Sequence, residues 1–201
     1  MEALAANRLD ALLDALASKT PAPGGGAVAS MTGATAAALA GMVVAYSVGK
    51  KSLAEHQTLL ESAEHRLREM RSEFLALADE DAAAYSALNE LQRLDQDDPR
   101  RTAEEPGAIR RAIEAPERAL NLSSELLAMA EGLVGRSNAH LRSDLAIAAV
   151  LAEAAAAAAA WNVRINALLL PEGERGALIA RVEQALAEAK DAREHVERAC
   201  G

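Results

Sequence analysis

Two long stretches made mostly of alanine constrain this chain more than any other feature. Residues 27–48 contain no charged residue, and residues 144–169 include an unbroken alanine run before Trp161. Alanine is the strongest helix former, so both stretches predict helices. A helix that is apolar on every face is normally buried, and alanine lets neighbouring helices approach closely. We therefore expect two central helices that the rest of the chain surrounds.

The composition indicates an all-α fold. The chain of 201 residues has one Phe, two Tyr and one Trp, so aromatic side chains cannot dominate its core. Ala, Leu, Glu and Arg favour helices, and the alternating pattern of a strand is hard to find. The length suits a single domain, residues 1–201. We expect an antiparallel bundle of about five to seven helices, with the long Ala-rich helices at its centre.

Apolar spacing and the positions of proline and glycine predict where the elements begin and end. The expected helices cover residues 4–18, 27–48, 53–94, 109–132, 144–169 and 177–199. We expect a kink or break near residues 79–81, a bend at Pro116 and a loop at residues 95–107, which contain two prolines. Ser143 or Asp144 is expected to cap the helix that follows.

Charge and cysteine content narrow the possible partners and compartment. The net charge of −9 and the lack of a basic stripe argue against nucleic acid as a partner. Cys200 is the single cysteine, which excludes an internal disulfide and suits a reducing compartment. The first residues are amphipathic and charged, without the apolar core of a secretory signal. We expect a cytoplasmic protein.

Residues 27–48 are also long enough to span a bilayer. Polar and small members such as Ser30, Thr32 and Gly33 make them weakly hydrophobic for insertion, so we expect a helix buried in protein and no membrane partner. Covering the remaining side of both Ala-rich helices calls for a second copy of the chain, and we expect a homodimer. A monomeric bundle with two central helices is the alternative.

Polar residues lie at both ends of the first Ala-rich stretch. Residues 21–26 (PAPGGG) precede it, and backbone N–H groups at a helix start attract anions and carbonyl oxygens. The glycines also suit a tight turn between helices. Lys50 and Lys51 follow the stretch, either as a solvated helix end or as a site for an anion.

Carboxylates and amides stand out in the rest of the chain. Asp81 and Tyr85 are four residues apart and share a helix face, although neighbouring acids are often simple surface charge. Asn162 and Asn166 also share a face, inside an apolar helix where an unsatisfied amide is costly. A ligand or the opposite helix could supply their partners, and Asn138 precedes the same helix.

Residues 9–51 resemble the N-terminal signature of the cyclodeaminase/cyclohydrolase family. This family includes the cyclodeaminase part of formiminotransferase-cyclodeaminase and stand-alone methenyltetrahydrofolate cyclohydrolases. The shared pattern is a first helix, then P-x-P-G-G-G, a small-residue helix, Met42-Val43 and a closing G-K-K at residues 49–51. Asp81 with Tyr85 resembles the family's D-x-x-x-[FY] segment, and residues 143–166 resemble its S-D…N-V-x-x-N helix. The resemblance covers nearly the whole chain in order.

Three positions depart from the family pattern. Ala27 stands where the family often has Ser, Ser52 where an aromatic residue is common, and His140 where a second Asn is frequent. These positions bear on the detail of the substrate.

The resemblance implies a cyclodeaminase-like bundle and chemistry on one-carbon tetrahydrofolates. One family reaction closes 5-formiminotetrahydrofolate to 5,10-methenyltetrahydrofolate with loss of ammonia, and the other adds water to the methenyl bridge to give 10-formyltetrahydrofolate. Both pass through a delocalised cation at the carbon between N5 and N10, which a carboxylate would stabilise. A proton carrier must serve the leaving amine or the attacking water. The tetrahydrofolate derivative is the substrate, and no metal cofactor is expected.

The resemblance also implies roles for individual residues. Asp81 and Asp144 are the predicted catalytic carboxylates. The predicted substrate-binding residues are Pro23, Gly24, Gly25, Gly26, Lys50, Asn138, His140, Asn162 and Asn166. The glycines would form a pocket wall, the asparagines would orient the pterin, and Lys50 would attract a glutamate-tail carboxylate. His140 would carry protons near neutral pH.

Two other functions remain open at this point. One is a catalytically silent folate-binding protein or helical dimer module of the same fold, and the other is an unrelated helical enzyme with a similar loop. Appearance or loss of methenyltetrahydrofolate absorbance separates an enzyme from a silent module.

Overall fold

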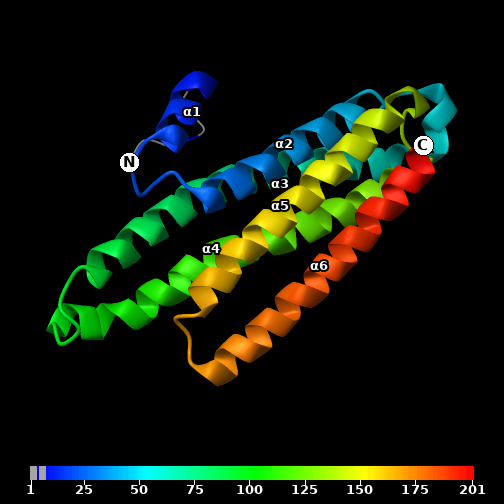
Figure 1. Cartoon of the computed structure of the whole chain (residues 1–201). Coiled ribbons are helices and arrows are strands. Elements are labelled where there is room, and N and C mark those ends of the chain that lie inside the picture. Colours follow the sequence, from blue (N-terminus) through cyan, green and yellow to red (C-terminus); the bar gives the residue numbers. More distant parts are fainter. Residues whose placement is uncertain (1–3, 5–7) are drawn as a thin grey trace.

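The helical expectation is confirmed by the computed structural model, which describes Leu4 and residues 8–201 (Figure 1). These residues form no strand. Within them lie α1 (Leu9–Ala17), α2 (Gly25–Ala45), α3 (Gln57–Gln92), α4 (Pro99–Leu133), α5 (Arg142–Ala167) and α6 (Glu172–Cys200), with the 3-10 segments η2 (Lys51–His56) and η3 (Ala139–Leu141).

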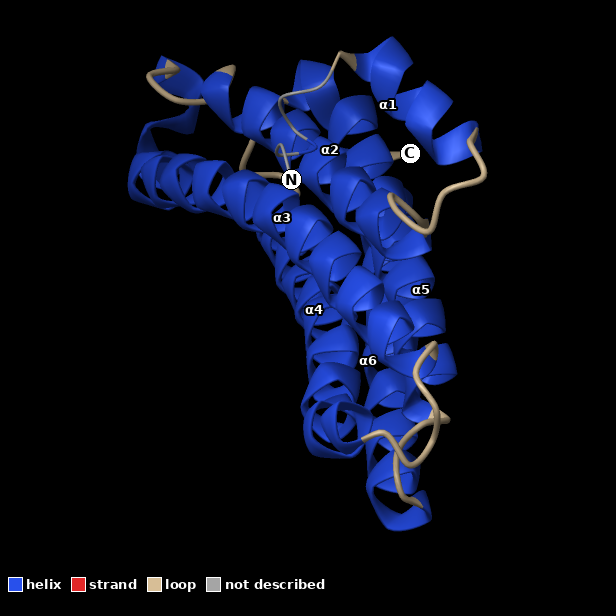
Figure 2. Cartoon of the chain, turned by 90° about the vertical axis from the view of Figure 1, so that its left-hand side faces the viewer, coloured by secondary structure: helices blue, strands red, loops and turns tan. Residues whose placement is uncertain are grey.

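Helices α2 to α5 form a four-helix bundle. α2 packs on α3 and α5, α4 packs on the same two helices, and α6 lies against α4 and α5. The turns before α4 and before α6 lie at one end of the bundle, and the connections before α3 and before α5 lie at the other (Figures 1 and 2). Each of α2 to α5 therefore runs antiparallel to its neighbours in the sequence.

Small side chains let α2 and α5 occupy the centre. The alanines of both helices that face inward are buried, among them Ala36, Ala40, Ala152 and Ala156. Larger core side chains come from α3 and α4 instead. A Cβ on Gly33 would lie 2.4 Å from the ring of Phe74, so α2 approaches α3 at a position that only glycine fits. The expectation of central Ala-rich helices is confirmed.

The loop expected at residues 95–107 is shorter than predicted, because α4 begins at Pro99 and only residues 95–98 of that range lie outside a helix. The carboxylate of Asp98 accepts hydrogen bonds from the backbone N–H groups of Arg100 and Arg101, at 2.8 and 3.3 Å. Proline at the first helical position loses no hydrogen bond there, and the cap satisfies the first exposed donors. The polar and proline-rich composition of this segment marks a helix start and not a loop.

No break occurs at residues 79–81, because α3 runs unbroken from Gln57 to Gln92. The acidic side chains there bind outside their own helix: Asp79 accepts the N–H of Leu4, and Glu80 pairs with Arg118 of α4. Neither Ser143 nor Asp144 caps α5, which has no side-chain cap. Asn138 instead caps η3 by accepting the N–H of His140.

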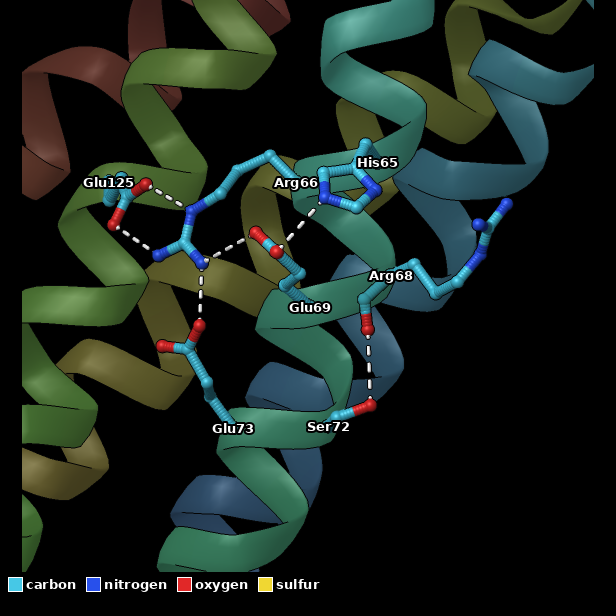
Figure 3. A network of polar contacts seen from close by, with 7 residues as sticks. All are labelled: His65, Arg66, Arg68, Glu69, Ser72, Glu73 and Glu125. Atoms are coloured by element: carbon cyan, nitrogen blue, oxygen red, sulfur yellow. Dashed lines mark hydrogen bonds and ion pairs between the residues drawn. The ribbon is translucent and has the colours of Figure 1, made fainter.

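An arginine on the surface ties α3 to α4. Arg66 donates to both carboxylate oxygens of Glu125, at 2.7 and 2.8 Å, and to Glu73 at 2.5 Å (Figure 3). These bonds hold the pKa of the Glu125 carboxyl below its usual value. Two parallel bonds between a guanidinium and a carboxylate fix direction as well as distance, so this pair links the two helices in a defined geometry.

Two helices in the described part of the chain are long and apolar enough to cross a membrane by length and composition alone. They are Gly25–Ala45 and the segment Ala139–Ala167, of which 56% and 44% of the most apolar window is buried in the bundle. Core helices of soluble proteins pass the same test, so this is weak support for a membrane span.

Candidate active site

A cavity of about 330 Å³ opens where the start of α2 meets the middle of α3 and the end of α5. Its size lies at the lower end of the range for small-molecule sites. The residues that line it are Pro21, Ala22, Gly24, Gly25, Gly26, Asp81, Ala82, Tyr85, Ala112, Asn162, Ile165 and Asn166. The glycine loop, the carboxylate and the two asparagines that the sequence singled out are therefore brought together.

The glycines make room for two polar side chains. A Cβ on Gly26 would lie 2.2 Å from both carboxylate oxygens of Asp81, which no side chain could occupy without displacing that group. A Cβ on Gly25 would lie 3.6 Å from Oδ1 of Asn162, an ordinary contact distance. Gly24 is the N-cap of α2 and offers no side-chain cap, so the first-turn N–H groups beside the cavity have no capping side chain.

Asp81 is the main ionisable group of the cavity. Its burial raises the pKa of the carboxyl to about 6, from a usual value near 3.8. Among the described residues no side chain or backbone group donates a hydrogen bond to it, so nothing offsets the loss of solvation. Tyr85 lies one turn further along α3 and is the other lining residue with a titratable side chain.

The two asparagines use their amide nitrogens, and not their amide oxygens, in hydrogen bonds within the protein. Nδ2 of Asn162 donates to the carbonyl of Ala158 at 3.0 Å, and Nδ2 of Asn166 donates to the carbonyl of Ala112 at 2.7 Å. Each amide nitrogen uses one of its two N–H groups in this way, and each amide oxygen is left to accept hydrogen bonds. A ligand rich in N–H donors suits such a wall.

The bond from Asn166 has a specific origin. Pro116 stands inside α4 and lacks an N–H, so the carbonyl of Ala112, four residues earlier, has no donor within its own helix. Asn166 supplies that donor from α5. Its amide therefore satisfies a break in a neighbouring helix and at the same time lines the cavity.

Four predicted site residues lie at the other end of the bundle. Asn138 is buried and donates through Nδ2 to the carbonyl of Tyr46 at 3.4 Å, and its backbone N–H donates to Ser47 Oγ at 2.8 Å. Lys50 follows this contact and is partly buried, and His140 is exposed beside it. Asp144 lies in the first turn of α5 at this same end.

The predicted site residues therefore do not all meet within one protomer. α2 has 21 residues, which separates its two ends by roughly 30 Å. Asp81 of α3 lies beside the start of α2, whereas Lys50 and Asp144 lie near the other end of α2. Residue order along the chain does not show how far along antiparallel helices each residue lies. Pro23 belongs to the glycine loop but does not line the cavity.

Some lining residues were not predicted. Ala112 and Ile165 have no polar side chain to attract notice, although Pro116 signals an unsatisfied carbonyl at Ala112. Ala27, the departure from the family pattern, is fully buried in a cluster with Leu12 and Ala78. Its side chain therefore packs beneath α1 and does not line the cavity.

Comparison with known proteins gives a consistent picture. The family model described as formiminotransferase-cyclodeaminase matches residues 8–189. A methenyltetrahydrofolate cyclohydrolase from Methylorubrum extorquens is 30% identical over 79% of this chain and 78% of its own length. A formimidoyltransferase-cyclodeaminase from Gallus gallus is also 30% identical, but the match spans only 30% of that longer protein.

A solved structure has the same fold. The formiminotetrahydrofolate cyclodeaminase from Thermotoga maritima superposes with a TM-score of 0.90 at 26% sequence identity. The match covers 98% of this chain and 96% of that one.

Proposed function

Because the chain belongs to the formiminotransferase-cyclodeaminase family, we propose that it is a folate one-carbon enzyme that hydrolyses 5,10-methenyltetrahydrofolate to 10-formyltetrahydrofolate. The cyclohydrolase of M. extorquens, which matches over most of its length, supports this choice of reaction. The second candidate is ring closure of 5-formiminotetrahydrofolate with release of ammonia, which the structural match to the T. maritima cyclodeaminase supports.

The observation that carries the proposal is a partly buried carboxylate facing a wall of glycine and amide oxygens. The methenyl substrate carries a positive charge delocalised over N5, the bridging carbon and N10. Asp81 would stabilise this charge more strongly in the cavity than in water, because water is partly excluded. The oxygens of Asn162 and Asn166 would accept hydrogen bonds from the N–H groups of the pterin.

Asp81 also suits the proton transfers of the hydrolysis. Water attacks the bridging carbon and Asp81 takes one of its protons, which leaves a hydroxyl on that carbon. The bond from carbon to N5 then breaks as the hydroxyl proton is lost, and N5 receives a proton from Asp81. One proton in total goes to solvent. A carboxyl with a pKa of about 6 both accepts and returns a proton near neutral pH.

The protein is further proposed to act as a homodimer on a small folate substrate. Large apolar side chains stay exposed on both helices: Val28 and Met42 on α2, and Ile147, Trp161 and Ile165 on α5. Exposed large apolar side chains gathered on adjacent helices support an interaction site.

Loss of methenyltetrahydrofolate absorbance tests the reaction. Purified protein should accelerate this loss, and Asp81→Asn should slow turnover by a factor of about 10² to 10⁴. Formation of methenyltetrahydrofolate from the formimino compound, with ammonia release, tests the second candidate in the same instrument. If folded protein binds the folate but catalyses neither reaction, the silent-module alternative replaces the enzyme.

A further inference from the structure

α4 contains two prolines inside the helix, and they differ in their surroundings. Pro106 is exposed, whereas Pro116 is buried. Each lacks the N–H that would bond the carbonyl four residues earlier. For Pro106 that carbonyl belongs to the exposed Thr102, but for Pro116 it belongs to Ala112, which lines the cavity. The missing bond of Pro116 therefore lies at the wall of the candidate active site.

The side chain of Asn166 has one favourable orientation at this wall. Its Nδ2 donates to the carbonyl of Ala112 at 2.7 Å. Turning the amide by half a rotation would place Oδ1 against that carbonyl, and two oxygens that only accept hydrogen bonds would then face each other. The carbonyl of Ala112, a residue that is only 3% exposed, would also lose its donor. The turned amide is therefore disfavoured by a factor of about ten or more.

Asn162 lies on the same wall but is held differently. Its Nδ2 donates to the carbonyl of Ala158 at 3.0 Å, within α5 itself. In a continuous helix that carbonyl is already the acceptor for the backbone N–H of Asn162. It keeps a donor when the side chain turns, so the amide of Asn162 turns at less cost. Of the two amides, that of Asn166 is the one fixed by an acceptor that has no donor in its own helix.

We propose that Pro116 is a positioning residue of the cavity. By withholding a backbone N–H from Ala112, it makes the amide of Asn166 the donor for that carbonyl and keeps Oδ1 as the acceptor for a ligand. The identity of the ligand, a tetrahydropterin, rests on the proposed function. The fixed amide rests on the described contacts alone.

The fixed oxygen would select one edge of the ligand. The pyrimidine ring of a pterin carries N–H groups with a carbonyl oxygen beside them. The carboxylate of Asp81 and Oδ1 of Asn166 both accept hydrogen bonds, and none of the described residues that line the cavity is a cation. Such a wall favours the N–H groups and opposes the carbonyl. Pro116 is not among the lining residues, so it contributes to specificity through Asn166 and not by contact with the ligand.

Hydrogen exchange of the Asn166 side chain tests the fixed amide in the ligand-free protein. In the wild type, the Nδ2–H that bonds Ala112 should exchange slowly with water. Pro116→Ala supplies a backbone N–H to the same carbonyl, so this exchange, measured by NMR, should become at least about tenfold faster. Pro106→Ala makes the same change of residue elsewhere in α4 and should leave the exchange rate unaltered. An unchanged rate in Pro116→Ala would overturn the inference.

Replacement of Asn166 by aspartate tests the consequence for binding. Asn166→Asp keeps the size of the side chain but has no N–H, so the carbonyl of Ala112 would repel the carboxylate from its place. Binding of 5-formyltetrahydrofolate, measured by calorimetry, should weaken at least about tenfold. In a Pro116→Ala background the carbonyl has its own donor, and the carboxylate can again accept an N–H of the pterin. The affinity should then return to within about threefold of that of Pro116→Ala alone.

Two controls separate this rescue from a general effect of the new charge. The added charge is near Asp81 in both backgrounds, so that repulsion cancels in the comparison. Pro106→Ala should not rescue Asn166→Asp, and Pro116→Ala should not improve Asn162→Asp, whose acceptor lies in α5. Circular dichroism checks that each variant is folded. Pro116→Ser, which also restores the N–H, replaces Pro116→Ala if that protein does not fold.

The outcomes of the binding experiment separate the positioning role from the proposed function. Unaltered binding by Asn166→Asp, or equally weak binding with and without Pro116→Ala, would show that Pro116 does not position the amide and would overturn the inference. If the wild type binds no folate, the proposed function fails, and the exchange rate of the Asn166 amide alone decides whether Pro116 fixes it.

Discussion

Glycine is needed at position 26 because of a single neighbouring group, the carboxylate of Asp81. Gly26→Ala would place a methyl group 2.2 Å from both carboxylate oxygens, so Asp81 must move away and turnover should fall at least 100-fold. Gly25→Ala is the matched control, because its methyl group would lie 3.6 Å from Asn162 in ordinary contact. Measured kcat/KM for both variants, with circular dichroism to check folding, decides the point. Equal activity of the two variants would contradict this role for Gly26.

Asp81 should also leave a signature in the pH dependence of stability. Its pKa is raised to about 6 in the folded state from near 3.8 when unfolded, so the folded protein binds the proton more tightly. This group therefore favours folding below pH 4, and that contribution is lost as the pH rises through 6. Asp81→Asn should be more stable than wild type by about 3 kcal/mol at pH 8 and close to it at about pH 3. Urea unfolding at both values measures the difference.

The ionisation of Asp81 should also determine how the reaction rate depends on pH. If the carboxylate of Asp81 takes the proton from water, kcat/KM should rise with pH through about 6 and then level off. The residual activity of Asp81→Asn should lack this step. A step that persists in the variant would assign the proton transfer to another group.

At the scale of elements, the hydrogen bond that α4 lacks because of Pro116 is supplied by the amide of Asn166 on α5. Asn166→Ala leaves the carbonyl of Ala112 unsatisfied and should cost about 1–3 kcal/mol of unfolding free energy. Pro116→Ala restores the N–H within α4, so Asn166→Ala should cost much less in that background. Chemical denaturation of the four proteins gives the coupling energy. Additive losses would show that Asn166 does not serve the proline break.

Sequence patterns predicted the helices better than their boundaries. Alanine content and apolar spacing gave the central α2 and α5, because propensity and burial agree there. The segment at residues 95–107 was misread since proline and acidic residues mark helix starts as well as loops, and only the bond from Asp98 to the next turn distinguishes them. Acidic residues 79–81 suggested a break because their partners, Leu4 and Arg118, lie far away in sequence.

The candidate site was predicted in its parts but not in its layout. The glycine run, Asp81 and the two asparagines do meet at one cavity. Their meeting with Lys50 and Asp144 depends on where each lies along helices that run in opposite directions, and residue spacing does not contain that information. The polar atoms of Asn138 are used within the protein, which a single sequence could not show.

For the whole molecule, activity should depend on association. Ile147→Glu puts a charge among the exposed apolar residues of α5, where the side chain is 50% exposed in the protomer, so the bundle should still fold. If the protein is the proposed homodimer, this variant should sediment as a monomer and lose turnover. Leu59→Glu is the matched control on α3, where the side chain is 38% exposed, and should keep both mass and rate. A monomeric and fully active Ile147→Glu protein would contradict the need for a partner.

The contact between α2 and α5, which is lined by alanine, has a consequence for how the bundle folds. An alanine side chain has no rotamers to lose, so bringing these helices together costs conformational entropy only in the backbone. Each contact also releases little apolar area, which leaves the larger gains to the leucine, methionine and phenylalanine side chains of α3 and α4. Hydrogen exchange should therefore be slowest for the backbone amides of α3 and α4, and faster for those of α2 and α5.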